Sequence, residues 1–302
     1  MQTKKIGTIN EQKRRDTITA WLFLAPTLIS FGAFVVFPVF FSAFLSFTQW
    51  DFISGISSIK FVGIRNFVKM FQDEEVINAL KNTFIYTVTI VPISLCVSLV
   101  VAYMLNDKVH FKKTIRMMFF IPYISNTVAL ATVFKGLFRS DGPINMVLRD
   151  LGVSELPQWF SDPNLAKLPI IILAIWTGIG YQMLIYLAAL QDVPTELYEA
   201  AEIDGASPLK RFLKVTIPLI SPSTFYLLVV RTIAVFKLFS SVKIMSGSSS
   251  ERISTTLVLE IYRAAFGEYE FGYASAMSWV LFAIILMVTL VQMWGQKKWV
   301  HY

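Results

Sequence analysis

The chain has 302 residues, of which 55% are apolar before its 14 glycines are counted and 16% are charged. An average soluble domain is about 45–50% apolar and about 25% charged, so this composition excludes an ordinary soluble protein and, because the charge is low, an intrinsically disordered one. The net charge of +7 comes from Lys and Arg residues that lie between apolar runs and do not form a stripe with interleaved aromatic residues, and we therefore expect no nucleic-acid partner.

Six apolar segments divide the chain, and polar or charged residues bound each of them. They cover residues 21–47, 84–105, 114–138, 168–190, 219–243 and 271–294. A helix of about 20 residues crosses the bilayer hydrocarbon, and a helix is the only spanning form open to a chain without barrel-type alternation. The sequence therefore predicts an all-α, polytopic membrane protein with six transmembrane helices, surrounded by membrane lipid. One domain is expected over 21–298, with tails at 1–20 and 299–302.

Basic residues set the expected orientation. Five lie in the N-terminal tail and four follow the second apolar segment: Lys4, Lys5, Lys13, Arg14 and Arg15, then Lys108, Lys112, Lys113 and Arg116. Lys and Arg accumulate in cytoplasmic tails and short loops, so both regions should face the cytoplasm. An even number of spans then puts both termini and the loop 191–218 in the cytoplasm, and the longer loops 48–83, 139–167 and 244–270 outside.

Polar and aromatic residues inside the expected spans are candidates for a transport path. They are Asn126, Trp176, Tyr181, Gln182 and Arg231. A charge inside a membrane usually faces the bundle interior or a wet path, and Arg231 is expected near the midplane. Amide and aromatic groups suit sugars, whose apolar ring faces are rimmed by hydroxyls. Hydrogen bonds between helices would explain most of these residues equally well, and Lys237 is expected to extend outward to the interface.

The loop at 191–218 carries the signals of two short helices. Pro194 and Glu196 suit the start of the first helix, and Gly205 suits its end because glycine adopts a positive φ at little cost. Ser207 and Pro208 then suit the cap and first residue of a second helix. Such a helix either docks on a partner or only joins two spans, and its residues alone leave both readings open.

This loop also carries a family resemblance. Its residues Glu199-Ala-Ala-x-x-Asp204-Gly205-Ala206, followed by Phe212, Val215, Pro218 and Pro222, resemble the E-A-A loop of the membrane subunits of binding-protein-dependent ABC importers. In that family the loop forms a coupling helix that sits in a cleft of the ATPase subunit. The resemblance implies this ATPase-coupling role for Glu199, Ala200, Ala201, Asp204, Gly205 and Ala206.

The resemblance extends over residues 20–298 and is closest to the carbohydrate-uptake permeases related to the maltose system. Supporting stretches include Trp21-Leu-Phe-Leu-Ala-Pro26 and Gly142-Pro-Ile-Asn145. It implies a permease subunit, in the plasma membrane of a prokaryote, that forms half of the path for a sugar or oligosaccharide. The implied partners are a second homologous permease subunit, two ATP-binding subunits that hold ATP and Mg, and an extracellular solute-binding protein.

Motifs for chemistry on this chain are missing from the sequence. It contains no G-x-x-x-x-G-K-[ST] loop for a nucleotide phosphate and no H-E-x-x-H zinc motif, so any ATP use must sit on a partner. The two histidines, His110 and His301, lie outside the expected spans, which argues against an intramembrane serine protease. We therefore expect no catalytic residue, metal site or cofactor on this chain.

Alternatives from other classes stay open from the residues alone. A self-sufficient ion-coupled transporter or channel would need intramembrane carboxylates or broken helices in inverted repeats, and no Asp or Glu lies near the middle of an expected span. A protein that only scaffolds other membrane subunits is a further alternative. Within the importer class, a glycerophosphate-type solute is the alternative to a sugar.

Overall fold

The computed structural model describes residues 9–51, 53–106, 110–246 and 251–300. Lys4, Lys5 and Lys108, which helped to set the expected orientation, lie outside these ranges. Helices predominate in the described residues, and the one sheet there pairs two short antiparallel strands, β1 (Thr48–Gln49) and β2 (Lys60–Phe61). The expected all-α class is confirmed.

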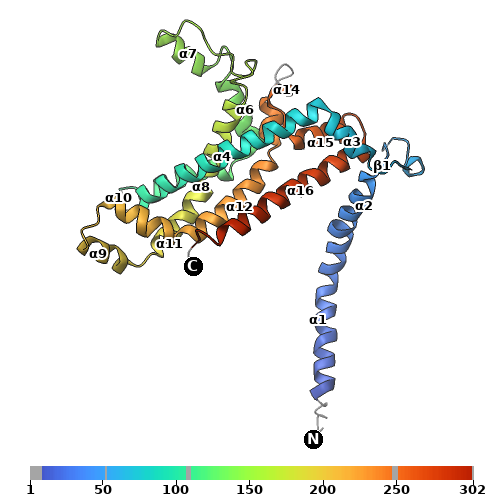
Figure 1. Ribbon diagram of the computed structural model, residues 1–302, viewed down its shortest axis with the longest axis horizontal. Coiled ribbons are helices and arrows are strands. Elements are labelled where there is room, and N and C mark those ends of the chain that lie inside the picture. Colours follow the sequence, from blue (N-terminus) through green and yellow to red (C-terminus); the bar gives the residue numbers. More distant parts are fainter. Residues whose placement is uncertain (1–8, 52, 107–109, 247–250, 301–302) are drawn as a thin grey trace.

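The helices are labelled in Figure 1. In chain order they are α1 (Ile9–Phe31), a π-helical turn (Gly32–Val36), α2 (Phe37–Ser46), a 3-10 turn (Ile56–Ser58), α3 (Arg65–Gln72), α4 (Glu74–Asn106), α5 (Lys112–Ile124), α6 (Thr127–Leu137), α7 (Pro143–Asp150), α8 (Leu168–Gln191), α9 (Thr195–Ile203), α10 (Pro208–Arg211), a second π-helical turn (Phe212–Thr216), α11 (Ile217–Leu219), α12 (Ser221–Phe236), α13 (Ser240–Met245), α14 (Glu251–Ser254), α15 (Leu257–Phe266) and α16 (Phe271–Gln296).

Four helical segments are long and apolar enough to cross a membrane: Lys13–Ser46, α4, α8 and α16. The other two expected spans are not straight helices. The third is broken between α5 and α6, which meet at 97°, and the fifth follows a 66° bend between Pro208–Leu219 and α12. Six spans result when each bent pair counts as one. The third predicted span, 114–138, is thus made of two helices that meet at Ser125 and Asn126, a break that the continuous apolar run does not show.

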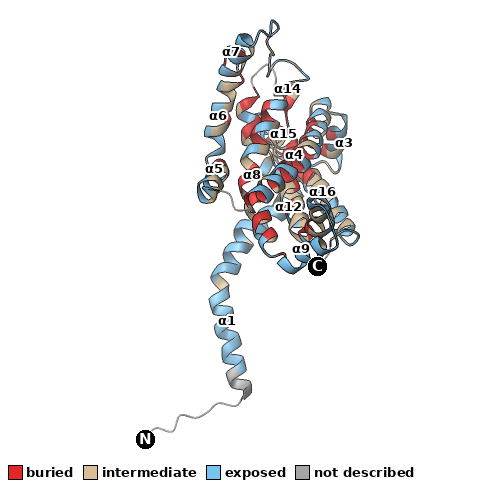
Figure 2. Ribbon diagram, turned by 90° about the vertical axis from the view of Figure 1, so that its left-hand side faces the viewer, coloured by how far each residue is buried: buried red, intermediate tan, exposed pale blue. Residues whose placement is uncertain are grey.

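The centre of the molecule is a bundle in which α4 packs along α8 and α12, and α5 packs on α8. Its largest fully buried side chains include Tyr86, Ile170, Met183 and Leu227. Figure 2 shows the buried residues concentrated where these helices meet, with α5, α6 and α7 stacked along one side. The core of the bundle therefore joins segments that lie far apart in the sequence.

The first helix, α1, stands apart from the bundle. Figure 1 shows α1 running away from the other helices, and its side chains Trp21 and Phe23, like Phe34 of the π-helical turn, are exposed. Contact with the bundle is made by α2, which packs on α16, where Trp279 donates a hydrogen bond to the Ser42 hydroxyl at 3.3 Å. Exposed apolar side chains carry no hydrophobic penalty in lipid, whose tails are as apolar as leucine.

Candidate coupling loop and transport path

The first helix of the 191–218 loop ends in a geometry that requires glycine. Gly205 has φ +71°, and its N–H donates to the Glu202 carbonyl oxygen at 3.0 Å. The N–H of Ala206 donates to the Ala201 carbonyl oxygen at 2.9 Å. This pair of bonds is the Schellman motif, which satisfies the last carbonyls of a helix and turns the chain away from it.

The second helix is capped as the sequence predicts and is tied to the first. The Ser207 hydroxyl accepts the N–H of Lys210 at 3.4 Å, and Pro208 is the first helical residue. An ion pair of 2.7 Å joins Arg211 to Glu202 of α9. Tyr198 of α9 shares a hydrogen bond of 2.9 Å with the Thr216 hydroxyl. These contacts connect α9 to the helix that leads into α12.

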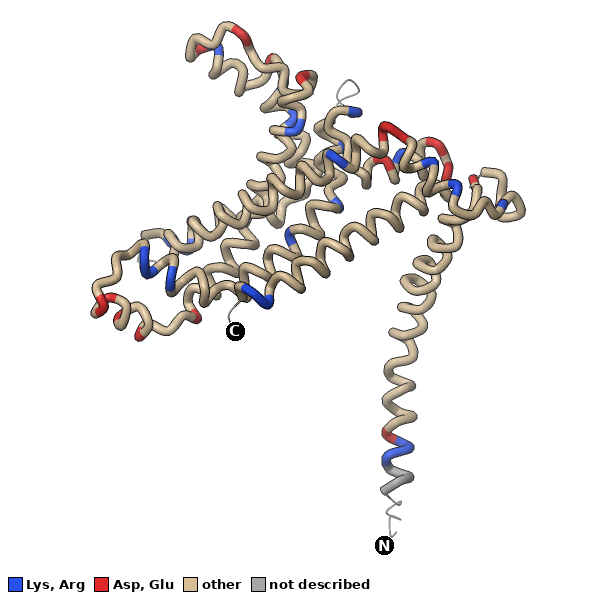
Figure 3. Tube along the Cα trace, viewed as in Figure 1, with Lys and Arg blue, Asp and Glu red and all other residues tan. Residues whose placement is uncertain are grey.

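The loop projects from one end of the bundle. No residue of α9 is buried, and the apolar side chains of Ile203 and Leu209 are 87% and 67% exposed. Figure 3 shows acidic residues on this loop, with basic residues on the adjoining helix. The six predicted coupling residues, Glu199, Ala200, Ala201, Asp204, Gly205 and Ala206, all lie on this element, and all are exposed or partly exposed. A short, exposed element of mixed charge with protruding apolar side chains has the properties of a protein-docking surface.

Aromatic side chains of α8 stack on both helices of the broken third span, α5 and α6. The ring of Tyr181 stacks on Tyr123 of α5 with 5.2 Å between centroids, and its hydroxyl shares a hydrogen bond of 2.9 Å with Tyr226 of α12. One and a half turns earlier in α8, Trp176 stacks on Phe134 of α6 at 5.5 Å. The structure therefore brings two predicted path residues together with three aromatic residues that sequence reasoning missed.

Asn126 causes the break. Its side-chain oxygen accepts the backbone N–H groups of Val128 at 2.8 Å and Ala129 at 3.3 Å, so Asn126 is the N-cap of α6, while Ser125 before it is extended. Asparagine is among the residues most favoured at this position. The sequence Ser125-Asn126 was therefore a signal from which the break could have been predicted.

Gln182 and Arg231 are engaged in helix packing. Gln182 is only 2% exposed and lies between α4 and α8 beside the hydroxyls of Ser94 and Ser98. The Arg231 guanidinium donates to the Ala174 carbonyl oxygen of α8. Lys237, in contrast, is exposed just after the end of α12. In this conformation Tyr181 and Trp176 are more accessible to a solute than Gln182.

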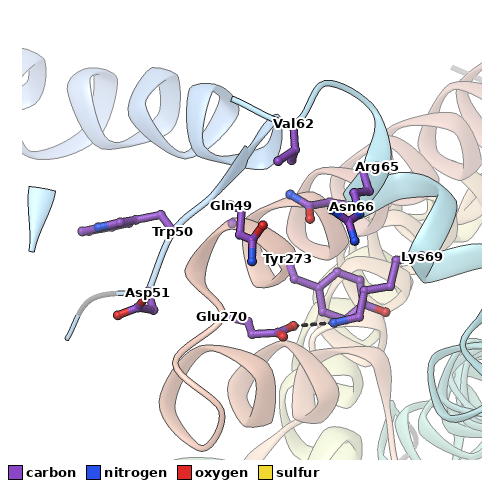
Figure 4. Close-up of a pocket in the computed structure, with 10 residues that line it drawn as sticks. Gln49, Trp50, Asp51, Val62, Arg65, Asn66, Lys69, Glu270 and Tyr273 are labelled. Atoms are coloured by element: carbon purple, nitrogen blue, oxygen red, sulfur yellow. Dashed lines mark hydrogen bonds and ion pairs between the residues drawn. The ribbon is translucent and has the colours of Figure 1, made fainter. Parts of the chain in front are cut away.

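A pocket of about 390 Å³ lies at the opposite end of the bundle from α9. Its lining includes Trp50, Asp51, Arg65, Lys69 and Glu270. Figure 4 shows the Lys69 ammonium facing Glu270 and the ring of Tyr273. Hydrogen bonds from the hydroxyl and the N–H of Ser54 lower the pKa of Asp51, which keeps this carboxylate ionised. The pocket thus presents charges of both signs and an indole ring.

The bent-helix bundle and its projecting loop define a multi-pass membrane component of a transport system. Residues 83–299 match the family of the binding-protein-dependent transport system inner membrane component, and the chain belongs to this family. Its members are permeases of ABC transporters and not enzymes themselves. The resemblance found in the sequence is confirmed, and the ion-coupled transporter and scaffold alternatives lose their support.

Similar proteins cover nearly the whole chain. A probable ABC transporter permease protein of Bacillus subtilis, YesP, is 36% identical over 96% of this chain and 94% of its own length. The lactose transport system permease protein LacF of Rhizobium radiobacter is 34% identical, with 95% and 96% covered. The arabinooligosaccharides transport system permease protein AraP of Bacillus subtilis is 34% identical, with 90% and 87% covered.

The solved structures support the fold. A chain of a bacterial ABC transporter involved in the import of the acidic polysaccharide alginate matches with a TM-score of 0.84 and 22% identity, over 97% of this chain and 99% of that one. A second structure of a bacterial alginate transporter, in complex with an alginate pentasaccharide-bound periplasmic protein, matches with a TM-score of 0.82 and 23% identity, over 97% and 98%.

Proposed function

We propose that this permease forms half of the path for a sugar or oligosaccharide in an ATP-driven importer. The lactose and arabinooligosaccharide permeases among its relatives support this substrate class. The importer also needs a second homologous permease subunit, two ATP-binding subunits that hold ATP and Mg, and an extracellular solute-binding protein. We further propose a prokaryotic plasma membrane as its location, with both termini and α9 in the cytoplasm and the pocket beside Lys69 on the face that receives the binding protein.

The observation that carries the proposal is the exposed α9 with its Schellman end. The signature from Glu199 to Ala206 is complete over this helix and the turn that ends it. Tyr198 and Glu202 hold α9 to the helix that follows, and the exposed residues of α9 offer a surface to an ATPase. Closure of the ATPases on ATP would displace α9, and the displacement would pass through α10 and α11 into α12. Such a movement biases the bundle between inward-open and outward-open states.

The broken third span supports a path beside Tyr181. Irregular backbone at membrane depth is tolerated only where protein buries it or where it lines a wet cavity. The break at Asn126 follows the 13 residues of α5, a helix about 20 Å long. Aromatic rings beside the break offer stacking surfaces to a sugar, and the Asn126 amide and tyrosine hydroxyls offer hydrogen bonds. We place the substrate contacts of this subunit on Tyr181, Trp176 and Asn126.

Cross-linking from position 201 tests the coupling proposal. In a Cys96→Ser background, Ala201→Cys labelled with a photoreactive thiol reagent is expected to cross-link to an ATP-binding subunit on illumination of native membranes, and ATP should change the yield. Val153→Cys, in the loop after α7, is the matched control and should capture no ATPase. If Ala201→Cys captured none either, despite normal expression, the docking of α9 would be contradicted.

Tyr181→Ala tests the path. We expect ATP-dependent uptake of lactose or arabino-oligosaccharides by the reconstituted transporter to fall about twofold to tenfold, because about 0.5–1.5 kcal/mol of aromatic contact is lost. Tyr181→Phe keeps the ring and should lose less. Ile172→Ala, an exposed apolar position on the same helix, should transport normally. Equal losses for Tyr181→Ala and Ile172→Ala would remove Tyr181 from the path.

One relative favours a second substrate class. The sn-glycerol-3-phosphate transport system permease protein UgpA of Yersinia pestis is 32% identical over 93% of this chain and 95% of its own length. All charged residues within the six expected spans are basic, which suits a phosphate-bearing solute. Uptake of sn-glycerol-3-phosphate in place of oligosaccharides by the reconstituted transporter would establish this alternative.

A further inference from the structure

Arg231 lies in the middle of α12, and its guanidinium group crosses to α8. Its Nη2 atom donates a hydrogen bond to the Ala174 carbonyl oxygen. A Cβ atom on Gly178 would lie 2.6 Å from this Nη2 and 2.7 Å from Cζ, distances that real side chains do not adopt. The guanidinium therefore lies directly against the backbone of α8, and a side chain at position 178 would have to displace it.

The contact continues through Gln182 to α4. With the amide oriented to satisfy its neighbours, its oxygen accepts the Nε–H of Arg231 at 3.3 Å, and its nitrogen donates to the Ser98 hydroxyl at 2.8 Å. Ser98 in turn donates to the Ser94 carbonyl oxygen at 2.6 Å. Both serines are fully buried. One directed series of hydrogen bonds thus connects α12, α8 and α4 inside the bundle.

This arrangement suits a cation that has no acidic partner. Among the residues that the structure describes, no carboxylate forms an ion pair with Arg231. A charge inside a membrane is costly unless protein groups solvate it, and here a carbonyl oxygen and an amide oxygen do so. The planar guanidinium donates in fixed directions, so its bonds hold only when α12 and α8 keep their present register.

We propose that Arg231 is a positioning residue that locks α12 to α8 and α4, so that the three helices move together when the coupling loop is displaced. The inference rests on the proposed function, because α12 is the helix that follows the coupling loop. Its neighbour Thr232 accepts a hydrogen bond from Gln292 of α16 at 2.9 Å, so adjacent residues attach α12 to helices on two sides. Arg231 acts in this way as a mechanical connection and not as a ligand of the solute.

The first test measures how the effect of Gly178→Ala on the thermal unfolding midpoint of the complete transporter depends on the presence of Arg231. Gly178→Ala is expected to lower the thermal unfolding midpoint when Arg231 is present, because the added methyl group displaces the guanidinium. In an Arg231→Met background the same Gly178→Ala change should be neutral or stabilising, since the space is then free and alanine favours helix. An equal effect of Gly178→Ala in both backgrounds would overturn the lock.

The second test measures motion in the same complex. Spin labels at Ile172→Cys and Ala234→Cys, exposed positions on α8 and α12, in a Cys96→Ser background, report the distance between the two helices. We expect this distance to stay constant on addition of Mg-ATP in the otherwise unsubstituted chain, and to shift or broaden in Arg231→Met. Lys237→Met, which removes an exposed charge just beyond the same helix, should behave like the unsubstituted chain. Identical behaviour of Arg231→Met and Lys237→Met would contradict the proposal.

A third label separates this inference from the proposed function. Ile203→Cys on α9, paired with Phe40→Cys at an exposed position of α2, which is not one of the three locked helices, should show a distance change with Mg-ATP. If this pair does not respond in the otherwise unsubstituted chain, the coupling role of α9 fails. The Gly178 and Arg231 comparison needs no nucleotide and still decides whether the lock exists.

Discussion

Gly205→Pro is expected to abolish ATP-driven import while the permease still inserts into the membrane. Gly205 has φ +71°, whereas proline is fixed near −65°. Proline also lacks the N–H that donates to the Glu202 carbonyl oxygen. The Schellman motif therefore cannot form, and α9 loses its defined orientation relative to Ser207 and the helix that follows. The measurement is uptake and ATP hydrolysis by the reconstituted transporter, together with the amount of permease in the membrane.

Gly205→Asn is the matched control. No atom lies within 4 Å of a Cβ built on Gly205, so a Cβ atom meets no neighbour there. The effect of a substitution then depends only on whether the new residue adopts the positive φ. Asparagine adopts positive φ far more readily than other residues with a side chain. It should retain most of the import activity. Normal uptake by Gly205→Pro would show that the geometry of this helix end is irrelevant to coupling.

Gly180→Ala is expected to destabilise the whole permease. A Cβ atom at this position would lie 2.3 Å from the Phe119 carbonyl oxygen and 2.8 Å from the Phe120 Cα atom. Both are backbone atoms of α5, so relief requires that α5 move away from α8 as a unit. Overpacking of this kind costs about 1–3 kcal/mol or more. A lower thermal unfolding midpoint of the purified transporter, and less folded protein in the membrane, would measure the effect.

Gly295→Ala is the control for packing at a helical glycine. Gly295 lies in the last turn of α16, where a Cβ would meet no atom within 4 Å, and alanine is the better helix former. We expect the midpoint to stay the same or rise. If Gly180→Ala unfolded at the same temperature as Gly295→Ala, the close crossing of α5 over α8 would be contradicted.

The straight spans and the loop signals could be predicted from the sequence. The segments expected over 168–190 and 271–294 correspond to Leu168–Gln191 and Phe271–Gln296, because each is an apolar run that ends at polar residues. The loop helices follow from local chemistry: Gly205 ends one and Ser207 begins the next. Such features depend only on residues that are close in the sequence, so they can be predicted without knowing which distant segments pack together.

The angles of the bent spans and the surroundings of Arg231 could not be predicted in the same way. The apolar pattern runs through the break at Asn126, and the direction that the chain takes there depends on the packing of α5 on α8 at Gly180. The guanidinium of Arg231 finds its place only because Gly178 leaves a gap. The direction of the chain after the break and the place of the guanidinium both depend on contacts between distant segments, which no local pattern encodes, although Ser125 and Asn126 mark the position of the break.

The 66° bend at Ile220 would change the direction of any movement that passes from the proposed coupling loop into α12. The helix from Pro208 to Leu219 is about 18 Å long and meets α12 at this angle. The two helices therefore act as the two arms of an angled lever. A rotation of about 10° at the bend would carry the far end of the arm through about 3 Å. The buried side chain of Ile220 sits at the pivot. A push delivered by a cytoplasmic partner along one direction would thus emerge in the membrane as a tilt in another.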